Sequence, residues 1–320
     1  MGERKSFAIL VAVFLVGFAF GVYVGYVRGI PFIGKRFVWS IGVYVGSSPF
    51  DLSPPKDLVN PVLTAEDVRD VDAEYVADPF MVFENGTWYM FFEVMNSETH
   101  QGDIGLAVSS DGFHWTYKRI VLDEPFHLSY PYVFKWGKKY YMIPETGENC
   151  SVRLYEAAKF PTEWRYVKTL LYGCYLDPSI IHYNDTWWLF VYSREGILRL
   201  FYARNLTGPW IEHPMSPIVK CNCSVARPGG RLIVFRDRVI RFAQDDSQAY
   251  GVRVYAFEVI ELTAEKYAER WVPGNPVLEP SGSGWNADGM HNMDAHQLGG
   301  GGWIACVDGY RVEYVFGLGY

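Results

Sequence analysis

A unit of about fifty residues returns five times between Ala77 and Cys306, and each copy reads as a β-hairpin. The first copy runs Ala77-Asp-Pro-Phe-Met-Val-Phe, turns at Glu84-Asn-Gly and returns as Thr87-Trp-Tyr-Met-Phe-Phe-Glu93. The other copies begin at Ser129, Leu176, Ala226 and Asn292. An apolar strand, a two-residue turn and an aromatic strand are typical of a hairpin. Repeated small sheets of this length predict an all-β, five-bladed β-propeller over residues 31–320.

One strand lies outside the order of the repeat. The segment Trp39–Gly46 is similar to the outer strand that begins at Ile104, yet it precedes the first hairpin. We therefore expect a strand at about residues 37–46 to complete the last blade and close the ring, which removes exposed sheet edges. Within the fourth blade, Glu261–Arg270 has the composition of a short inserted helix.

The first thirty residues differ from the rest of the chain. Ser6–Tyr26 carries no charge, and about twenty apolar residues suffice to cross a bilayer. No small-residue cleavage site follows. The sequence predicts a cytoplasmic tip and one transmembrane helix (a signal anchor) in residues 1–30, with membrane contact through residues 6–27. Gly17, Gly21 and Gly25 have the spacing of a helix-pairing face, so a homodimer through them is a hypothesis.

Several features favour a single-pass cell-membrane protein with its propeller on the extracytoplasmic side. Five Asn-x-Ser/Thr acceptors are present, at Asn85, Asn149, Asn184, Asn205 and Asn222. The five cysteines show no metal-binding pattern, and outside the cytoplasm they permit one or two disulfides with an odd thiol left over. The net charge of -7, without a basic block, excludes nucleic-acid binding.

The chemistry-bearing residues stand at the start and end of the hairpins. The second residues of the five copies are Asp78, Tyr130, Asp177, Arg227 and Asp294. In a propeller these positions face a shared funnel, where converging carboxylates shift each other's pKa. The returning strands end at Glu93, Glu145 and the pair Gln244 and Asp245. Paired carboxyl groups suit glycoside chemistry, which needs one ionised and one protonated group.

Three motifs carry a family resemblance: the hairpin starts Ala77-Asp-Pro and Leu176-Asp-Pro-Ser, and the strand Ser109-Ser-Asp-Gly-Phe-His-Trp115. They resemble the five-bladed furanosidase superfamily, notably glycoside hydrolase family 43. That resemblance implies Asp78 as general base and Asp177 as the residue that tunes the acid. The family's general acid is a glutamate at the start of the fourth blade, where this chain has Arg227. A guanidinium does not donate a proton near neutral pH. Glu145, beside apolar neighbours, is the candidate replacement.

A second resemblance covers nearly the whole propeller. It rests on Phe126-His-Leu-Ser-Tyr-Pro-Tyr-Val-Phe134, Tyr141-Met-Ile-Pro-Glu-Thr146, Ser151-Val-Arg-Leu-Tyr-Glu156, Ala226-Arg-Pro and Arg241-Phe-Ala-Gln-Asp-Asp246. These motifs are similar to the N-terminal domain of plant glucosamine inositolphosphorylceramide transferases, in which a separate C-terminal glycosyltransferase domain follows. This resemblance implies a sugar-related role and leaves the reaction open.

Further residues are candidates for ligand contacts. His127 is a candidate sugar-binding residue, and Arg227 suits a neighbouring carboxylate or an anionic ligand. His291, Asp294 and His296 could hold an ion at the channel end, where a structural calcium ion is a hypothesis. The sequence predicts no other cofactor.

The leading hypothesis is a membrane-anchored glycosidase of the family 43 type that acts on a surface glycan or glycolipid. Asp78 would be the base, Asp177 the stabiliser and Glu145 the acid. One alternative is a non-catalytic glycan-binding propeller, or one that partners a transferase, and ion pairs of Arg227 across the site would favour it. Another alternative is a glycosyltransferase or phosphorylase that uses an anionic sugar donor.

Overall fold

The computed structural model describes residues 11, 13–18, 20, 21, 33–194 and 196–316. Contacts divide the chain into two compact units. The larger unit is Trp39–Arg311, and the smaller one consists of Met1–Val38 and Val312–Tyr320. In the smaller unit Arg36 and Glu313 form an ion pair at 2.5 Å.

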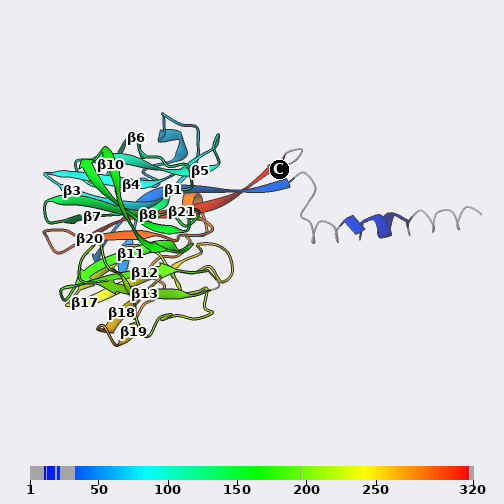
Figure 1. The fold of residues 1–320 in the computed structure, drawn as a ribbon. Coiled ribbons are helices and arrows are strands. Elements are labelled where there is room, and N and C mark those ends of the chain that lie inside the picture. The colour runs from blue at the N-terminus through cyan, green and yellow to red at the C-terminus, as the bar shows by residue number, and fades with distance from the viewer. Residues whose placement is uncertain (1–10, 12, 19, 22–32, 195, 317–320) are drawn as a thin grey trace, which may run out of the picture. The chain divides into compact units, whose positions relative to one another are not determined.

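The larger unit is a five-bladed β-propeller, which confirms the predicted fold class (Figure 1). The first blade contains β3 (Ala73–Glu84), β4 (Thr87–Asn96), β5 (Gln101–Ser109) and β6 (Thr116–Leu122). The second contains β7 (Ser129–Trp136), β8 (Lys139–Glu145), β9 (Ser151–Lys159) and β10 (Glu163–Tyr172). The third contains β11 (Leu176–Tyr183), β12 (Thr186–Tyr192), β13 (Leu198–Ala203) and β14 (Ile211–Glu212).

The last two blades depart from this simple order. The fourth contains β15 (Arg227–Pro228), β16 (Ile233–Phe235), β17 (Arg238–Gln244), β18 (Val254–Leu262) and β19 (Tyr267–Trp271). The fifth has the strand order β2 (Asp51–Ser53), β1 (Ile33–Ser48), β21 (Trp303–Phe316) and β20 (Met293–Gln297). The first strand of the chain therefore lies beside the last strand in one sheet. Two short 3-10 helices, η1 (Ala65–Asp67) and η2 (Gly284–Asn286), lie in connections.

The hairpins turn where the sequence repeat predicts. At Asn85-Gly86 and at Asn184-Asp185 both central residues have a positive φ. Two-residue turns of this hand match the twist of paired strands. The returning strands bury aromatic side chains, so that Phe91, Phe92 and Phe190 are fully buried in the core between blades. This packing explains the high aromatic content of the chain.

The predicted helix at Glu261–Arg270 is wrong. Most of this segment belongs to β18 and β19, which pair through Leu262↔Tyr267 and Val259↔Glu269. Between the strands, the Thr263 hydroxyl accepts hydrogen bonds from the backbone N–H of Glu265 at 3.3 Å and of Lys266 at 3.0 Å. The alanine, glutamate and lysine residues favour a helix, but this preference is weak. Pairing of the segment with the edge of the blade outweighs it.

Most of the predicted membrane segment lies outside the described residues. The described positions of this segment, 11, 13–18, 20 and 21, are helical and exposed. Gly17 and Gly21 have no atom within 4 Å of an added Cβ, and Gly25 is outside the described part. Among the helices that are described, none is both long enough and apolar enough to span a bilayer.

Two surface features bear on the environment of the propeller. Cys150 and Cys174 form a disulfide that joins the β8–β9 turn to the end of β10, while Cys221, Cys223 and Cys306 are free thiols. The asparagines of all five glycosylation acceptors are exposed. Their exposure leaves glycosylation sterically open.

Candidate functional site

Three blades begin with the same backbone irregularity. Asp78, Tyr130 and Asp177 each precede a proline and have φ values of 54°, 45° and 47°. At each of them the register of the hairpin shifts. A non-glycine residue with a left-handed backbone costs about 1–2 kcal/mol. Strain repeated at equivalent positions of a ring indicates a functional centre.

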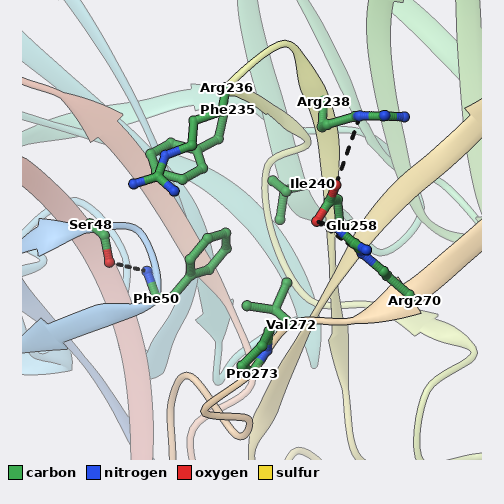
Figure 2. A pocket seen from close by; sticks show the side chains of 10 residues that line it. All are labelled: Ser48, Phe50, Phe235, Arg236, Arg238, Ile240, Glu258, Arg270, Val272 and Pro273. Carbon is green, nitrogen blue, oxygen red and sulfur yellow. Dashed lines mark hydrogen bonds and ion pairs between the residues drawn. The ribbon is translucent and has the colours of Figure 1, made fainter.

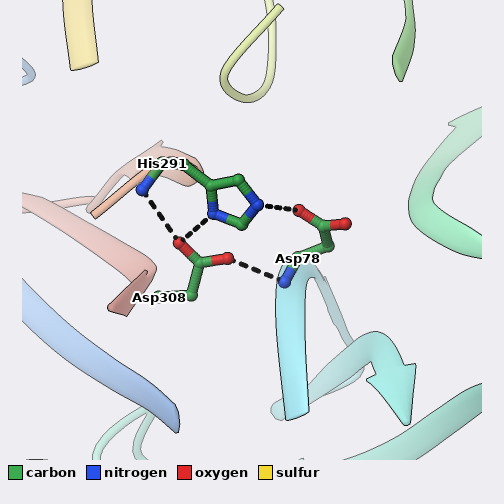
Figure 3. Close-up of side chains that lie close together, drawn as sticks. All are labelled: Asp78, His291 and Asp308. Carbon is green, nitrogen blue, oxygen red and sulfur yellow. Dashed lines mark hydrogen bonds and ion pairs between the residues drawn. The ribbon is translucent and has the colours of Figure 1, made fainter. Parts of the chain in front are cut away.

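Asp78 belongs to a buried cluster with two residues of the fifth blade (Figure 3). The Asp78 backbone N–H donates to Asp308 Oδ2 at 2.9 Å. The ring of His291 lies between the two carboxylates, with Nδ1 2.8 Å from Asp308 Oδ1 and Nε2 3.4 Å from Asp78 Oδ1. None of the three side chains is appreciably exposed. The cluster therefore joins the first blade to the fifth.

Burial and neighbouring charges act in opposite directions on the pKa of Asp78 and on that of His291. Burial raises the pKa of Asp78 to about 7, against the opposing charge of His291. Burial alone would lower the pKa of His291, but the charges of Asp308 and Asp78 raise it to about 9. At neutral pH the imidazolium thus lies between two carboxyl groups, and Asp78 exchanges its proton in the physiological range. Such a carboxyl group suits general acid–base catalysis.

The same three residues are the group that could hold a metal ion in the described part of the chain, with ligand atoms within 4.8 Å of one another. Both ring nitrogens of His291 already face carboxylates. Calcium takes six to eight oxygen ligands, as a rule. A protonated imidazole supplies the positive charge here, so these residues fit a proton-bearing triad better than a calcium site.

Tyr250 covers this cluster from a loop of the fourth blade. Its hydroxyl lies 3.1 Å from His291 Nε2. Its ring faces the guanidinium of Arg227, with 4.9 Å between the ring centroid and Cζ. The next residue, Gly251, has a φ of 64°, and an added Cβ there would lie 2.7 Å from His291 Cβ. Glycine therefore permits the loop to approach His291.

Arg227 joins the acidic residues of the neighbouring blades. Its Nε lies 2.5 Å from Asp177 Oδ2, and other guanidinium nitrogens lie 3.5 Å from Asp246 and 3.9 Å from Glu145. Gln244 Nε2 also donates to Asp177 Oδ2, at 2.9 Å. Burial disfavours the charged form of Arg227, but the nearby Asp177 raises its pKa well above the usual range. Arg227 thus fills the position of a missing acid with a permanent, paired cation.

The surroundings of Glu145 favour its protonated form. It accepts a hydrogen bond from the Asp177 backbone N–H at 3.2 Å. Burial, and then the negative charge of Asp177, raise the pKa of Glu145 well above its ordinary range. Arg227 opposes this shift only weakly, because its guanidinium lies closer to Asp177 than to Glu145. The surroundings of Glu145 therefore favour its neutral form.

A second carboxyl group with a raised pKa is Glu93 in β4. Burial, and then the charge of Asp78, raise its pKa well above the usual range. Its Oε1 lies 3.3 Å from the Tyr75 hydroxyl and 3.5 Å from His127 Nε2. The Gly102 backbone N–H donates to His127 Nδ1 at 2.9 Å, so Nε2 carries the proton toward Glu93. His127 is partly exposed and lies at the rim of the cluster.

Two of the predicted site residues, Asp294 and Asp245, lie elsewhere. Asp294 is fully buried and accepts hydrogen bonds from Met81 N–H and from Arg231, and it also contacts His296. The predicted ion-binding trio is therefore split, since His291 lies with Asp78 instead. Tyr130 stays at the site, because its backbone N–H donates to Asp78 Oδ2 at 3.2 Å, while its buried hydroxyl lies 2.8 Å from Ser179 Oγ. Asp245 accepts from Ser247, and it is Asp246 that contacts Arg227.

Asp308, Asp246 and Tyr250 are site residues that the sequence reasoning missed. Asp308 lies within β21, and its backbone N–H donates to the Asn292 carbonyl at 3.3 Å. It is the counterpart of Glu93 and Glu145. Extending the fifth copy of the repeat by two residues past Cys306 would have identified it. Asp246 and Tyr250 lie in the connection between β17 and β18, which is longer than the corresponding connections of the first three blades, so the repeat carries no signal for them.

The His291 cluster leads to a prediction about stability. The raised pKa of His291, about 9, means that its proton stabilises the fold fully below pH ~6.5 and that this contribution is lost as the pH rises through about 9. Asp78 acts in the same direction at lower pH. We expect the free energy of unfolding to fall between about pH 6.5 and 9 by on the order of 1–3 kcal/mol more than in His291→Gln. Denaturant unfolding at both pH values measures this, and equal slopes for the two proteins would contradict it.

Comparison with known proteins places this chain among sugar-related sequences. A family profile described as "Glucosamine inositolphosphorylceramide transferase 1, N-terminal" matches residues 34–310. The chain is 40% identical over 300 residues to glucosamine inositolphosphorylceramide transferase 1 of Oryza sativa subsp. japonica, with 86% of this chain and 40% of the relative covered. The Arabidopsis thaliana protein of the same name is 36% identical over 300 residues, with 39% of its length covered. The chain thus spans about two fifths of the length of these relatives.

The solved structures resemble this chain in fold alone. A glycosyl hydrolase from Bacteroides ovatus has a TM-score of 0.58 and 12% sequence identity, with 81% of this chain and 92% of that chain covered. At this identity the likeness supports the architecture and leaves the reaction of this chain to its own residues.

Proposed function

The chain belongs to the family of the N-terminal domains of glucosamine inositolphosphorylceramide transferase 1, and from that premise we propose that it binds a glycan or glycolipid and cleaves a glycosidic bond in it. Asp78 is the base, Glu145 the proton donor, and Asp177 with Arg227 the polar support of Glu145. Membrane anchoring through the N-terminal segment and exposure on the cell surface are parts of the same proposal.

The observation that carries the proposal is the contrast between the two carboxyl groups. Burial raises the pKa of Asp78 to about 7, whereas burial and the nearby Asp177 raise the pKa of Glu145 well above its ordinary range. Glycoside cleavage requires such a pair, one group to activate the nucleophile and one to protonate the leaving oxygen. In this proposal the proton donor is Glu145 of the second blade. The fourth blade cannot supply it, because Arg227 stands at that position.

Glu145→Gln tests the proton donor. Glutamine keeps the neutral shape and the hydrogen bond from Asp177 N–H but has no acidic proton, so we expect turnover to fall by about 10²-fold or more. Stability should change by less than about 1 kcal/mol, because glutamine has nearly the same size and keeps the accepted hydrogen bond. The measurement is sugar release by the purified full chain from a panel of aryl furanosides, pyranosides and native glycans.

The matched control for this variant is Glu156→Gln. Glu156 lies on β9 and forms ion pairs with Lys139 and Arg165, outside the candidate site. The control should retain turnover. Full activity of Glu145→Gln would assign the proton to another group, and Glu93 would be the next candidate.

One observation favours a second candidate function. Arg227 pairs with Asp177 and Asp246 and lies 3.9 Å from Glu145, so no acid stands at the start of the fourth blade, where family 43 enzymes have theirs. A propeller that binds a glycan for a separate transferase would need only this polar surface. Glycan binding by the chain without sugar release, unchanged in Asp78→Asn, would support this candidate.

A further inference from the structure

A second pocket lies between the fourth and fifth blades, away from the candidate site (Figure 2). We call it the arginine pocket, since its walls include Arg236, Arg238 and Arg270, with Glu258, Phe50 and Phe235. Its volume is about 450 Å³. Arg227 pairs with Gln244 at one end of β17, and Arg238 is at the other end. Six residues of strand separate these ends by ~20 Å, so the two sites are distinct.

The pocket has three positive charges against one negative charge, in a chain with a net charge of -7. Glu258 is shared by two of the arginines: Arg270 Nη2 lies 2.9 Å from its Oε2, and Arg238 Nε lies 3.8 Å from its Oε1. Arg236 has no hydrogen bond or ion pair within the described residues, and its Cζ lies 5.0 Å from the centre of the Phe235 ring. A guanidinium with five donors is therefore available at the pocket wall.

The backbone conformation of Arg236 is unusual for an arginine. Arg236 and Asp237 form the β16–β17 turn with φ values of 50° and 58°. Asparagine or glycine usually occupies such positions, as Asn85-Gly86 does in the first blade. An arginine is an unfavourable choice for this turn, yet the turn places its guanidinium over the pocket.

Apolar groups form the rest of the wall. The rings of Phe50 and Phe235 meet edge to face with 5.3 Å between their centroids. Figure 2 shows Phe50 between Arg236 on one side and the Arg238, Arg270 and Glu258 group on the other. A ligand that fits both features carries a compact anion and an apolar or flat ring. Arginine forks match the oxygens of a phosphate group.

We propose that the arginine pocket binds a phosphate monoester. Arg236 holds the phosphate, and the organic part packs on Phe50 and Phe235. The phosphate could belong to a soluble ester or to a lipid headgroup at a membrane surface, since the chemistry of recognition is the same. This proposal is independent of the reaction at the Asp78 site.

The test uses the full chain and three probes at a pH of about 7.5, above the second phosphate pKa of about 6. Phenyl phosphate, followed by calorimetric titration, should bind about tenfold more tightly than phenyl sulfate, which has the same ring and one charge less. Inorganic phosphate should bind more weakly than the phenyl ester. Phosphatidylcholine vesicles with and without phosphatidic acid probe the lipid source by co-sedimentation.

Substitutions in one turn separate binding from folding. Arg236→Gly should raise the melting temperature, because glycine accepts the positive φ, and should weaken phenyl phosphate binding about tenfold or more. Asp237→Gly relieves the same backbone conformation and should retain binding. Glu258→Gln should strengthen binding by freeing the two arginines. Arg204→Ala removes an exposed arginine outside the pocket and should have no effect.

The outcomes distinguish the sources and can overturn the proposal. Saturable binding of phenyl phosphate that Arg236→Gly abolishes assigns a soluble ester. Binding of phosphatidic acid vesicles alone, abolished by the same variant, assigns a lipid headgroup. If neither probe binds, or if Arg204→Ala weakens binding as much as Arg236→Gly, the arginine pocket is not a phosphate site.

Discussion

Asp78→Asn is expected to lower glycosidic turnover by about 10²–10⁴-fold while the chain remains folded. Asparagine keeps the size of the side chain but accepts no proton, and it removes the charge that His291 faces at 3.4 Å. The amide also avoids the cost of a buried charge, so stability near neutral pH should not fall by more than about 1 kcal/mol. Initial rates on the best substrate of the panel, with unfolding curves for both proteins, measure the two effects.

The control for Asp78→Asn is Asp111→Asn, on the exposed turn of the first blade, where Asp111 contacts His114. It should keep full turnover. If Asp78→Asn and the control release sugar equally well, Asp78 is not the base and the glycosidase proposal fails. If neither the native chain nor any variant releases sugar but glycans bind, the binding propeller becomes the better account.

Removing the cation at Arg227 is expected to produce the largest loss of stability. Arg227→Met fills a similar volume but leaves Asp177, which is almost fully buried, without its closest charge partner at 2.5 Å. Breaking a buried pair from one side costs about 3–5 kcal/mol. By comparison, Arg165 is exposed, and Arg165→Ala leaves its partner Glu156 paired with Lys139, so this change should cost less than about 1 kcal/mol. Denaturant unfolding gives both values.

The companion variant Asp177→Asn, added to Arg227→Met, checks the cause. Neutralising Asp177 removes the unpaired charge, so the double variant should recover more than half of the loss. A loss below about 1 kcal/mol in Arg227→Met would mean that the ion pairs contribute little to folding. Arg227 would then be available to an anionic ligand, which is the third hypothesis from the sequence.

The repeat carried most of the fold prediction. Hairpin turns, aromatic strands and a fifty-residue period are local signals, so five blades could be predicted without any knowledge of how they pack. The same frame located Asp78, Asp177 and Arg227 at one end of the ring, where the structure brings Arg227 and Asp177 into contact. The wrong helix at Glu261–Arg270 shows the limit of local signals, because pairing with a neighbouring strand decided that segment.

The site was harder to predict where the repeat degenerates. In the fifth copy, Asp294 has the appearance of the aspartates at the other blade starts, yet His291 is the residue that reaches Asp78. A shift of three residues in a weak repeat cannot be seen without the register of the strands. Asp246 and Tyr250 depend on the path of one loop, which is set by contacts distant in sequence.

The arrangement of the fifth blade has a consequence for the order in which function appears during folding. The hydrogen bond from Asp78 N–H to Asp308 spans 230 residues of sequence, so it forms only when the last strands have joined the first blade. Contacts so distant in the chain form late, because the entropy of the long intervening loop opposes them. A growing or truncated polypeptide could assemble the first four blades and still lack the His291–Asp308 pair. The Asp78 cluster would then be complete only in a chain whose ring has closed.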